Sequence, residues 1–257
     1  MPVYTDEGRM QYEGHPTPQV LGLGDSWFWY HVNNLLIPVS QLWAPEKIVL
    51  TQGGAGADAV ELAEGGKRTA FRRVLRGSPN LQAVLLSAGG NDFAGVTDMF
   101  RILVKNGSNA QKGEDCFIAS ELNALMYIEV LGAYRTLVGD VERLRPEALV
   151  FVHNYDYAVP TGIGLFGGMG HWLKEPMDRV GIPAGLQQAA VNHLMDTFSD
   201  ALVQLQSEYP EHVILVDSTG ILGAGDWANE LHPTAGGFDK LVAQAWTRPL
   251  MDNLPPN

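Results

Sequence analysis

The sequence predicts an α/β fold, a three-layer α/β/α sandwich in which helices cover both faces of a parallel β-sheet. Two observations predict it: short apolar runs bounded by turn residues, and longer stretches of helical periodicity between them. The chain has 257 residues, and no repeat or low-complexity linker divides its sequence. We therefore expect residues 1–257 to form a single domain.

Five short runs are expected to be strands. Their continuous apolar character is typical of strands buried on both faces of a sheet. The runs are Val20–Leu23, Ile48–Thr51, Ala83–Ser87, Ala148–Val152 and Val213–Val216. We expect them to pair in the flavodoxin-like order 2-1-3-4-5.

The stretches between and after these strands carry apolar residues at three- and four-residue steps, which predicts helices. The expected helices are Ala57–Leu75, Ser120–Arg145, Pro183–Glu208 and Thr234–Met251. Two other stretches lack this pattern. Residues Asp92–Asp115 are polar and are expected to form a loop with a short helix. The Gly-rich insertion Ala158–Pro183 carries Phe166, Met169 and Trp172. Its composition suits either a flexible apolar lid over the site or a disordered surface loop.

Composition excludes several classes of function. The sequence has 29 acidic and 17 basic residues, a net charge of −12, which disfavours nucleic acid and anionic lipid as partners. The single cysteine, Cys116, cannot form an internal disulfide, and no Cys/His cluster has the spacing of a metal site. No apolar run approaches the roughly 20 residues that span a bilayer, and the first residues do not resemble a signal peptide. We expect a cytoplasmic protein, although a removed leader would leave no trace.

Polar residues follow the expected strands where a parallel sheet places its working site, beyond the carboxyl ends. Gly24-Asp25-Ser26-Trp27 follows the first strand. Ser26 would begin a helix and project its hydroxyl into the crevice. The alternative is that Asp25 or Ser26 only caps that helix.

The next two strands end in glycine-rich turns. Residues 51–58 contain Gly53, Gly54 and Gly56, whose backbone N–H groups can approach a ligand. A phosphate-binding loop is the competing interpretation, but the Lys-Ser/Thr ending is missing. After the third strand, the Asn91 side chain either donates into the crevice or makes a local turn.

His232 lies near the C-terminus and precedes Pro233, which favours an extended backbone. It can act as a base for Ser26 if its loop returns across the sheet. In the expected order the last strand lies three strands from the first, about 14 Å at about 4.8 Å per strand. The chain between the last strand and His232 is long enough to cover that distance.

These blocks, Gly24-Asp25-Ser26, a glycine after the second strand, Gly89-Gly90-Asn91-Asp92 and His232-Pro233, resemble the four signature blocks of the SGNH (GDSL) hydrolase family. The resemblance spans positions 24 to 233 and implies the same flavodoxin-like fold. It implies that Ser26 is the nucleophile and, through its backbone N–H, an oxyanion donor. Gly56, or Gly54 in another register, would give a second N–H, Asn91 a side-chain donor, and His232 the base. It implies no cofactor and no metal.

The chain departs from the family at Asn229, three residues before the histidine, where the family usually has aspartate. An amide oxygen orients an imidazole but does not stabilise its charged form as a carboxylate does. Three explanations stay open. Asn229 itself orients His232, which we favour. A backbone carbonyl does so in a Ser-His dyad, or another carboxylate does: Asp226, Glu230 or Asp156.

The expected function is a serine esterase that cleaves a lipid-like, aryl or short-acyl carboxylic ester. Trp27, Phe166, Met169 and Trp172 are the expected substrate contacts, although the aromatic run 27–30 also suits a core. His153 after the fourth strand is either a metal or substrate contact or a structural residue. The alternatives are a metal-dependent phosphoesterase, an inactive binding module, and an acyltransferase that uses the same serine. The sequence does not indicate an oligomeric state.

Overall fold

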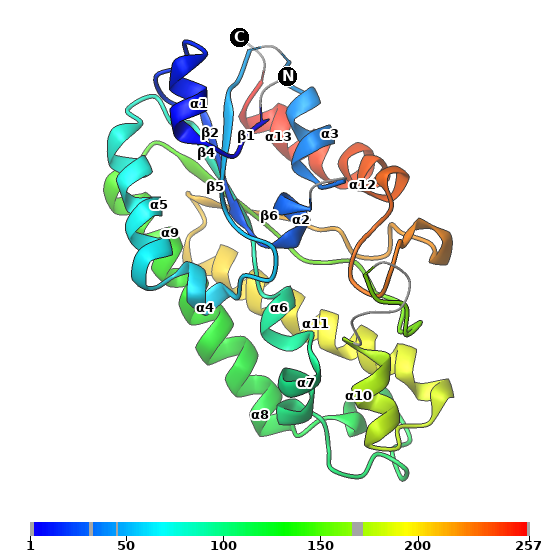
Figure 1. The fold of residues 1–257 in the computed structure, drawn as a ribbon. Coiled ribbons are helices and arrows are strands. Elements are labelled where there is room, and N and C mark those ends of the chain that lie inside the picture. Colours follow the sequence, from blue (N-terminus) through cyan, green and yellow to red (C-terminus); the bar gives the residue numbers. More distant parts are fainter. Residues whose placement is uncertain (1–2, 31–32, 45, 166–171, 256–257) are drawn as a thin grey trace.

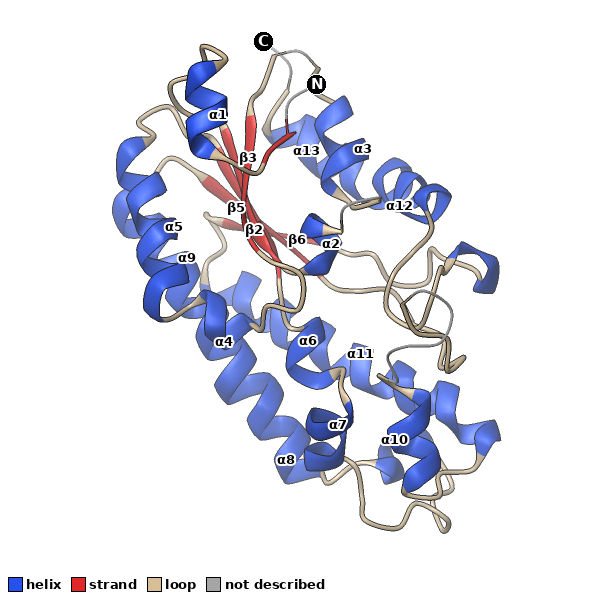
Figure 2. Ribbon diagram, in the orientation of Figure 1, coloured by secondary structure: helices blue, strands red, loops and turns tan. Residues whose placement is uncertain are grey.

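The protein is described here from a computed structural model, which covers residues 3–30, 33–44, 46–165 and 172–255. Its sheet is parallel throughout and has the order β1-β3-β2-β4-β5-β6. Figure 2 shows the strands in red between the helices. The strands are β1 Val3–Tyr4, β2 Val20–Gly24, β3 Val49–Gly53, β4 Ala83–Ser87, β5 Leu149–His153 and β6 Val213–Val216.

The expected count of five strands is wrong by one. The sixth strand, β1, has two residues and pairs with the outer edge of β3. A two-residue segment is too short to show a sequence period, and only the tertiary structure brings it to the sheet. The other five strands pair in the expected order, with β2 between β3 and β4.

Helices cover both faces of the sheet. Figure 1 shows α5 and α9 on one side and α3, α12 and α13 on the other, while α6, α7, α8 and α10 lie beyond one end of the strands. The helices are α1 Glu7–Tyr12, α2 Ser26–Trp29, α3 Leu36–Gln41, α4 Ala59–Leu62, α5 Gly65–Gly77, α6 Gly90–Phe93, α7 Val96–Ile102, α8 Ala119–Asn123, α9 Leu131–Leu144, α10 Lys174–Arg179, α11 Ala184–Glu208, α12 Ala235–Leu241 and α13 Thr247–Asn253. Two π-helical segments, Ala124–Val130 and Val242–Trp246, join α8 to α9 and α12 to α13, and short 3₁₀ turns occupy Gly113–Cys116 and Ala224–Asp226.

Two expected helical stretches differ in detail from the structure. The stretch Ala57–Leu75 is divided into α4 and α5 at Gly65, whose φ of +51° is unfavourable for residues with a side chain. In the part of the insertion Ala158–Pro183 that the structure describes there is one short helix, α10. Phe166 and Met169 lie outside the described residues. No helix in the described part of the chain is long and apolar enough to cross a membrane.

The ends of β2 and β4 pair directly, with Gly24 beside Ser87, and this pairing positions the residues that follow them. Both strands are buried along their whole length. A Cβ atom on Gly24 would lie 2.7 Å from the Ser87 carbonyl oxygen, so only glycine fits there. Asp25 and Ser26 therefore leave the sheet directly beside the turn that carries Asn91.

Candidate active site

Ser26 is the first residue of α2, and Asp25 caps that helix by accepting a hydrogen bond from the Trp27 N–H at 3.0 Å. The capping role is therefore filled by Asp25. The Ser26 side chain makes a different contact, with His232. The expectation that the serine hydroxyl leaves the helix start toward the crevice agrees with this geometry.

The His232 loop does return across the sheet. His232 Nε2 lies 2.7 Å from Ser26 Oγ, although the two residues are 206 positions apart in the chain. The indole N–H of Trp27 donates to the Leu231 carbonyl at 2.9 Å, which ties α2 to the histidine loop. An isolated bridge between Trp227 and Pro233 closes that loop on itself. The sequence allowed this approach, and the packing of the loop produces it.

Asn229 Oδ1 lies 3.0 Å from His232 Nδ1. The same oxygen accepts the backbone N–H groups of Leu231 and His232, each at 2.9 Å. Backbone N–H groups only donate, so they fix the amide with its oxygen toward the imidazole. His232 Nδ1 then carries the proton, and Nε2 presents its lone pair to the Ser26 hydroxyl.

The three carboxylates considered as alternatives bind other groups. Asp226 accepts from Lys240 Nζ at 2.9 Å and from the Gly223 N–H. Asp156 accepts backbone N–H groups from the turn after β6, including those of Gly220, Ile221 and Leu222. Glu230 accepts four backbone N–H groups from the Gly-rich insertion. The side chain beside His232 Nδ1 is therefore the Asn229 amide.

The His232 imidazole is buried between aromatic rings. The Tyr30 ring stacks on it at 5.0 Å between centroids, and the Trp172 ring meets it edge-on at 6.0 Å. Burial lowers the pKa of His232 from the usual 6.5 to about 4. The neutral, proton-accepting form of the ring thus persists into acidic solution. The sequence indicates Tyr30 only as a part of the aromatic run 27–30 and carries no signal for its contact with the imidazole.

Asn91 lies next to the glycine-rich turn that follows β3. Its Nδ2 donates to the Ala57 carbonyl at 3.1 Å, and the amide has a second hydrogen for another acceptor. The Gly54 N–H already donates to the Gly24 carbonyl at 3.0 Å. Gly56 is exposed, with a φ of +79°. The geometry thus favours the register in which Gly56, and not Gly54, offers an N–H to a ligand.

A buried hydrogen-bond network centred on Asp25 lies beneath Ser26. The Asp25 carboxylate accepts from Ser87 Oγ at 2.9 Å and from the Tyr155 hydroxyl at 2.6 Å, in addition to the Trp27 N–H. The Tyr155 hydroxyl in turn accepts the Gly90 N–H at 3.3 Å. Burial raises the pKa of Asp25 to about 6. The position of Tyr155 just beyond β5 was the only sequence signal for this contact.

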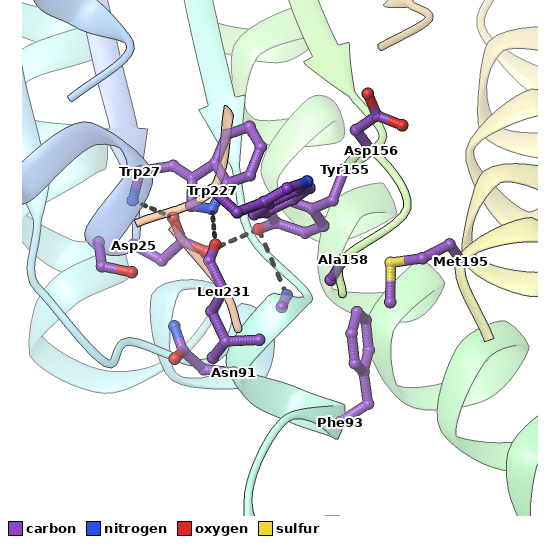
Figure 3. Close-up of a pocket in the computed structure, with 12 residues that line it drawn as sticks. Asp25, Trp27, Asn91, Phe93, Tyr155, Asp156, Ala158, Met195, Trp227 and Leu231 are labelled. Atoms are coloured by element: carbon purple, nitrogen blue, oxygen red, sulfur yellow. Dashed lines mark hydrogen bonds between the residues drawn. The ribbon is translucent and has the colours of Figure 1, made fainter. Parts of the chain in front are cut away.

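A small pocket of about 30 Å³ opens beside Ser26 (Figure 3). Its lining is mostly apolar, with Phe93, Ala158 and Met195 on the side away from Asp25. The full lining is Asp25, Ser26, Trp27, Gly90, Asn91, Phe93, Tyr155, Asp156, Ala158, Met195, Trp227 and Leu231. Of the expected substrate contacts, Trp27 lies on this pocket and Trp172 lies against His232 instead.

His153 has the position of a structural residue. Its Nδ1 donates to the Asn154 carbonyl at 2.9 Å, and its ring packs against those of Trp27, Phe28, Tyr155 and Trp246. Among the residues that the structure describes, no group of three His, Cys, Asp or Glu side chains is arranged to hold a metal ion.

No protein-family model matches the sequence, and no curated protein matches it either. Solved structures do match its fold. An extracellular lipase from Streptomyces rimosus aligns with a TM-score of 0.56 and 16% identity, over 91% of this chain and 98% of its own. A phospholipase A1 from Streptomyces albidoflavus NA297 aligns at 0.55 and 16%, over 92% and 99%.

A third structure, of a protein from Parabacteroides merdae assigned as a GDSL-like lipase, has a TM-score of 0.52 and 12% identity, over 92% of this chain and 96% of its own. At such identities the likeness establishes the fold alone, and any conclusion about the chemistry depends on the site residues of this chain. The chain therefore has the α/β/α fold of the GDSL-like lipases, the family that its four sequence blocks resemble.

Proposed function

We propose that the protein is a serine hydrolase of carboxylic esters. The observation that carries this proposal is the 2.7 Å contact between Ser26 Oγ and His232 Nε2, with the proton of the ring on Nδ1. A neutral imidazole with its lone pair toward a serine hydroxyl is the arrangement that general-base activation of a nucleophile needs.

In the first half of the reaction, Ser26 Oγ bonds to the ester carbonyl carbon while its proton moves to His232 Nε2. The carbonyl oxygen gains negative charge and accepts hydrogen bonds from the N–H groups of Ser26 and Gly56 and from Asn91 Nδ2. Each such donor is worth about 3 kcal/mol of barrier in a preorganised site. The C–O bond to the alcohol then breaks, and His232 gives its proton to the leaving alcohol.

In the second half, water attacks the acyl group on Ser26, and His232 Nε2 takes the proton of that water. The C–O bond to Ser26 Oγ then breaks and the serine recovers its proton from His232. A carboxylic acid leaves and the site returns to its starting state. Asn229 holds the ring in one tautomer throughout, without a negative charge beside the imidazolium.

The acyl group that we favour among lipid-like, aryl and short-acyl candidates is short. The pocket beside Ser26 measures about 30 Å³, and Phe93 and Met195 are among the residues that line it. A small, mostly apolar space of this kind suits a short acyl chain better than a long one. Of p-nitrophenyl esters, the acetate should have the highest kcat/KM and the octanoate the lowest. A preference for octanoate would contradict the short-acyl assignment.

The decisive experiment is covalent labelling of the purified protein by a fluorophosphonate, which reacts with activated serines. We expect the label on Ser26, with none on Ser26→Ala. Ser87→Ala serves as the control, because that hydroxyl donates to Asp25 and does not contact His232. An unlabelled wild-type protein that also fails to cleave p-nitrophenyl acetate would instead indicate a binding module.

A further inference from the structure

Glu230, between Asn229 and Leu231, is fully buried and binds two separate parts of the Gly-rich insertion. Its Oε1 accepts the N–H groups of Gly162 and Lys174, each at 2.9 Å. Its Oε2 accepts those of Trp172 at 3.1 Å and Leu173 at 3.0 Å. The Glu230 N–H donates to the Ile163 carbonyl at 3.1 Å. We call residues 162–163 and 172–174 the insertion flanks.

This arrangement requires a carboxylate. Four N–H donors converge on two oxygens, and each oxygen has two lone pairs to offer. A glutamine would place its NH₂ group against two of these donors and leave them unpaired. The four N–H groups also compensate the buried charge, which would otherwise be costly. Glu230 therefore fixes both insertion flanks to the histidine loop by bonds that no neutral side chain reproduces.

The insertion flanks carry Trp172, whose ring lies against the edge of His232. The imidazole of His232 is held by the neutral hydrogen bond that its Nδ1 donates to Asn229 Oδ1 and by the stacked Tyr30 ring. A neutral bond is weaker than one to a carboxylate. Contacts that confine the ring therefore contribute more to its orientation here than they would beside an aspartate.

We propose that Glu230 is a positioning residue, which holds the Trp172 ring against His232 and so keeps the imidazole buried and aimed at Ser26. This inference rests on the proposed esterase function. Glu230 touches neither the substrate nor the reacting atoms and acts only through Trp172.

The contacts themselves are tested by hydrogen exchange, which needs no activity. In Glu230→Gln the amides of the insertion flanks should exchange at least about tenfold faster than in the wild type. The matched control is Asp140→Asn. Asp140 is also a buried carboxylate, but it pairs with Arg68 on the far helix layer. That variant should leave exchange of the insertion flanks unchanged.

The consequence for catalysis is read from kcat/KM and its pH dependence. Misplacing a catalytic group by about 1 Å costs on the order of 100-fold, and we expect a loss of that size in Glu230→Gln, mostly in kcat. Burial is the cause of the low pKa of His232, so a withdrawn Trp172 ring should let that pKa rise from about 4 toward 6.5. The acid limb of the kcat/KM profile, where activity is lost as His232 takes up a proton, should move to higher pH by the same amount.

The groups that face His232 do not offer another cause for that shift. Trp172, Asn229 and Ser26 are neutral side chains, and Tyr30 meets the imidazole through its stacked ring. The carboxylate of Asp25 is turned to Ser87 and Tyr155, and that of Glu230 to the insertion flanks. Asp140→Asn should show the wild-type acid limb whatever its stability.

A double-mutant cycle with Trp172→Ala separates positioning from general destabilisation. If Glu230 acts through Trp172, adding Glu230→Gln to Trp172→Ala should lower kcat/KM by less than about threefold more. Multiplicative losses would overturn the inference. An unshifted acid limb in a folded Glu230→Gln with fast-exchanging insertion flanks would overturn it too.

Two further outcomes are distinguishable. If Glu230→Gln does not fold, Trp172→Ala alone must move the acid limb of the kcat/KM profile to higher pH. An acid limb at the wild-type pH in Trp172→Ala would overturn the inference. If the wild-type protein neither takes the fluorophosphonate nor cleaves p-nitrophenyl acetate, the proposed function and this inference fall together. If the wild-type protein is labelled normally and the acid limb of the variant stays at the wild-type pH, Glu230 is not a positioning residue. The esterase proposal is then unaffected.

Discussion

The serine side and the histidine side of the site are stabilised in opposite ways. Behind Ser26 lies a buried carboxylate, Asp25, which accepts three hydrogen bonds and whose pKa burial raises to about 6. Behind His232 lies the neutral amide of Asn229. The carboxylate that a serine hydrolase usually places behind its base is replaced here by an amide, and the buried carboxylate of Asp25 lies behind the nucleophile instead.

This difference separates two tasks that one aspartate usually performs together. Asn229 fixes the tautomer and direction of the imidazole by accepting from its Nδ1. It does not stabilise the imidazolium that forms when Ser26 loses its proton. The Asp25 carboxylate accepts hydrogen bonds from Trp27, Ser87 and Tyr155 and therefore does not stabilise the imidazolium either. The site is thus preorganised in geometry while the base keeps a low pKa.

The largest effect is expected on the serine side. Asn91→Ala removes a side-chain donor to the oxyanion and should lower kcat by about 100- to 1,000-fold. Steady-state kinetics with p-nitrophenyl acetate measure the loss. The far-ultraviolet circular dichroism spectrum should stay as in the wild type. A kcat within tenfold of the wild type would remove Asn91 from the oxyanion site.

On the histidine side, Asn229→Ala removes the acceptor of His232 Nδ1 and of two backbone N–H groups. We expect kcat to fall by about tenfold or more, because the imidazole then loses its fixed tautomer. The kinetics should be measured below the thermal midpoint of the variant, since the loop is also weakened. A loss of less than tenfold would mean that packing against Tyr30 and Trp172 orients the ring without Asn229.

Asn229→Asp sharpens the comparison by adding the missing charge. A carboxylate beside Nδ1 stabilises the imidazolium and raises the pKa of His232 above about 4. The proton-accepting neutral ring is then lost at a higher pH as the solution is acidified. We expect kcat to rise about tenfold at pH 8 and the acid limb of the profile to move upward. A gain at pH 8 with an unmoved limb would refute this account.

The smallest effect concerns the bond that joins the two sides. Trp27→Phe keeps most of the ring but leaves the Leu231 carbonyl without the indole donor. We expect the free energy of unfolding to fall by about 1–3 kcal/mol, as chemical denaturation would measure. Trp43→Phe is the matched control, because its indole donates to the Leu254 carbonyl far from the site. Only Trp27→Phe should also lower kcat, by a few fold.

Much of the site could be predicted because its residues follow strand ends. Gly24-Asp25-Ser26 and Gly89-Gly90-Asn91 are local signals, and parallel strands place their carboxyl ends at one edge. The two-residue strand β1 and the stacking of Tyr30 on His232 have no local signal. For the contact of Tyr155 with Asp25, the only signal is the position of Tyr155 just beyond β5. Each depends on segments that are distant in the chain.

The sequence by itself determined the layered α/β architecture, the order of the five longer strands and the residue types that carry the proposed chemistry. These follow from apolar periodicity and turn residues, which act over a few neighbours. Only the tertiary structure decided which acceptor faces His232 and which carboxylate binds the insertion. Asn229, Glu230 and Asp226 lie within five positions of one another, and loop packing, with its convergence of backbone N–H groups, gives each a different partner.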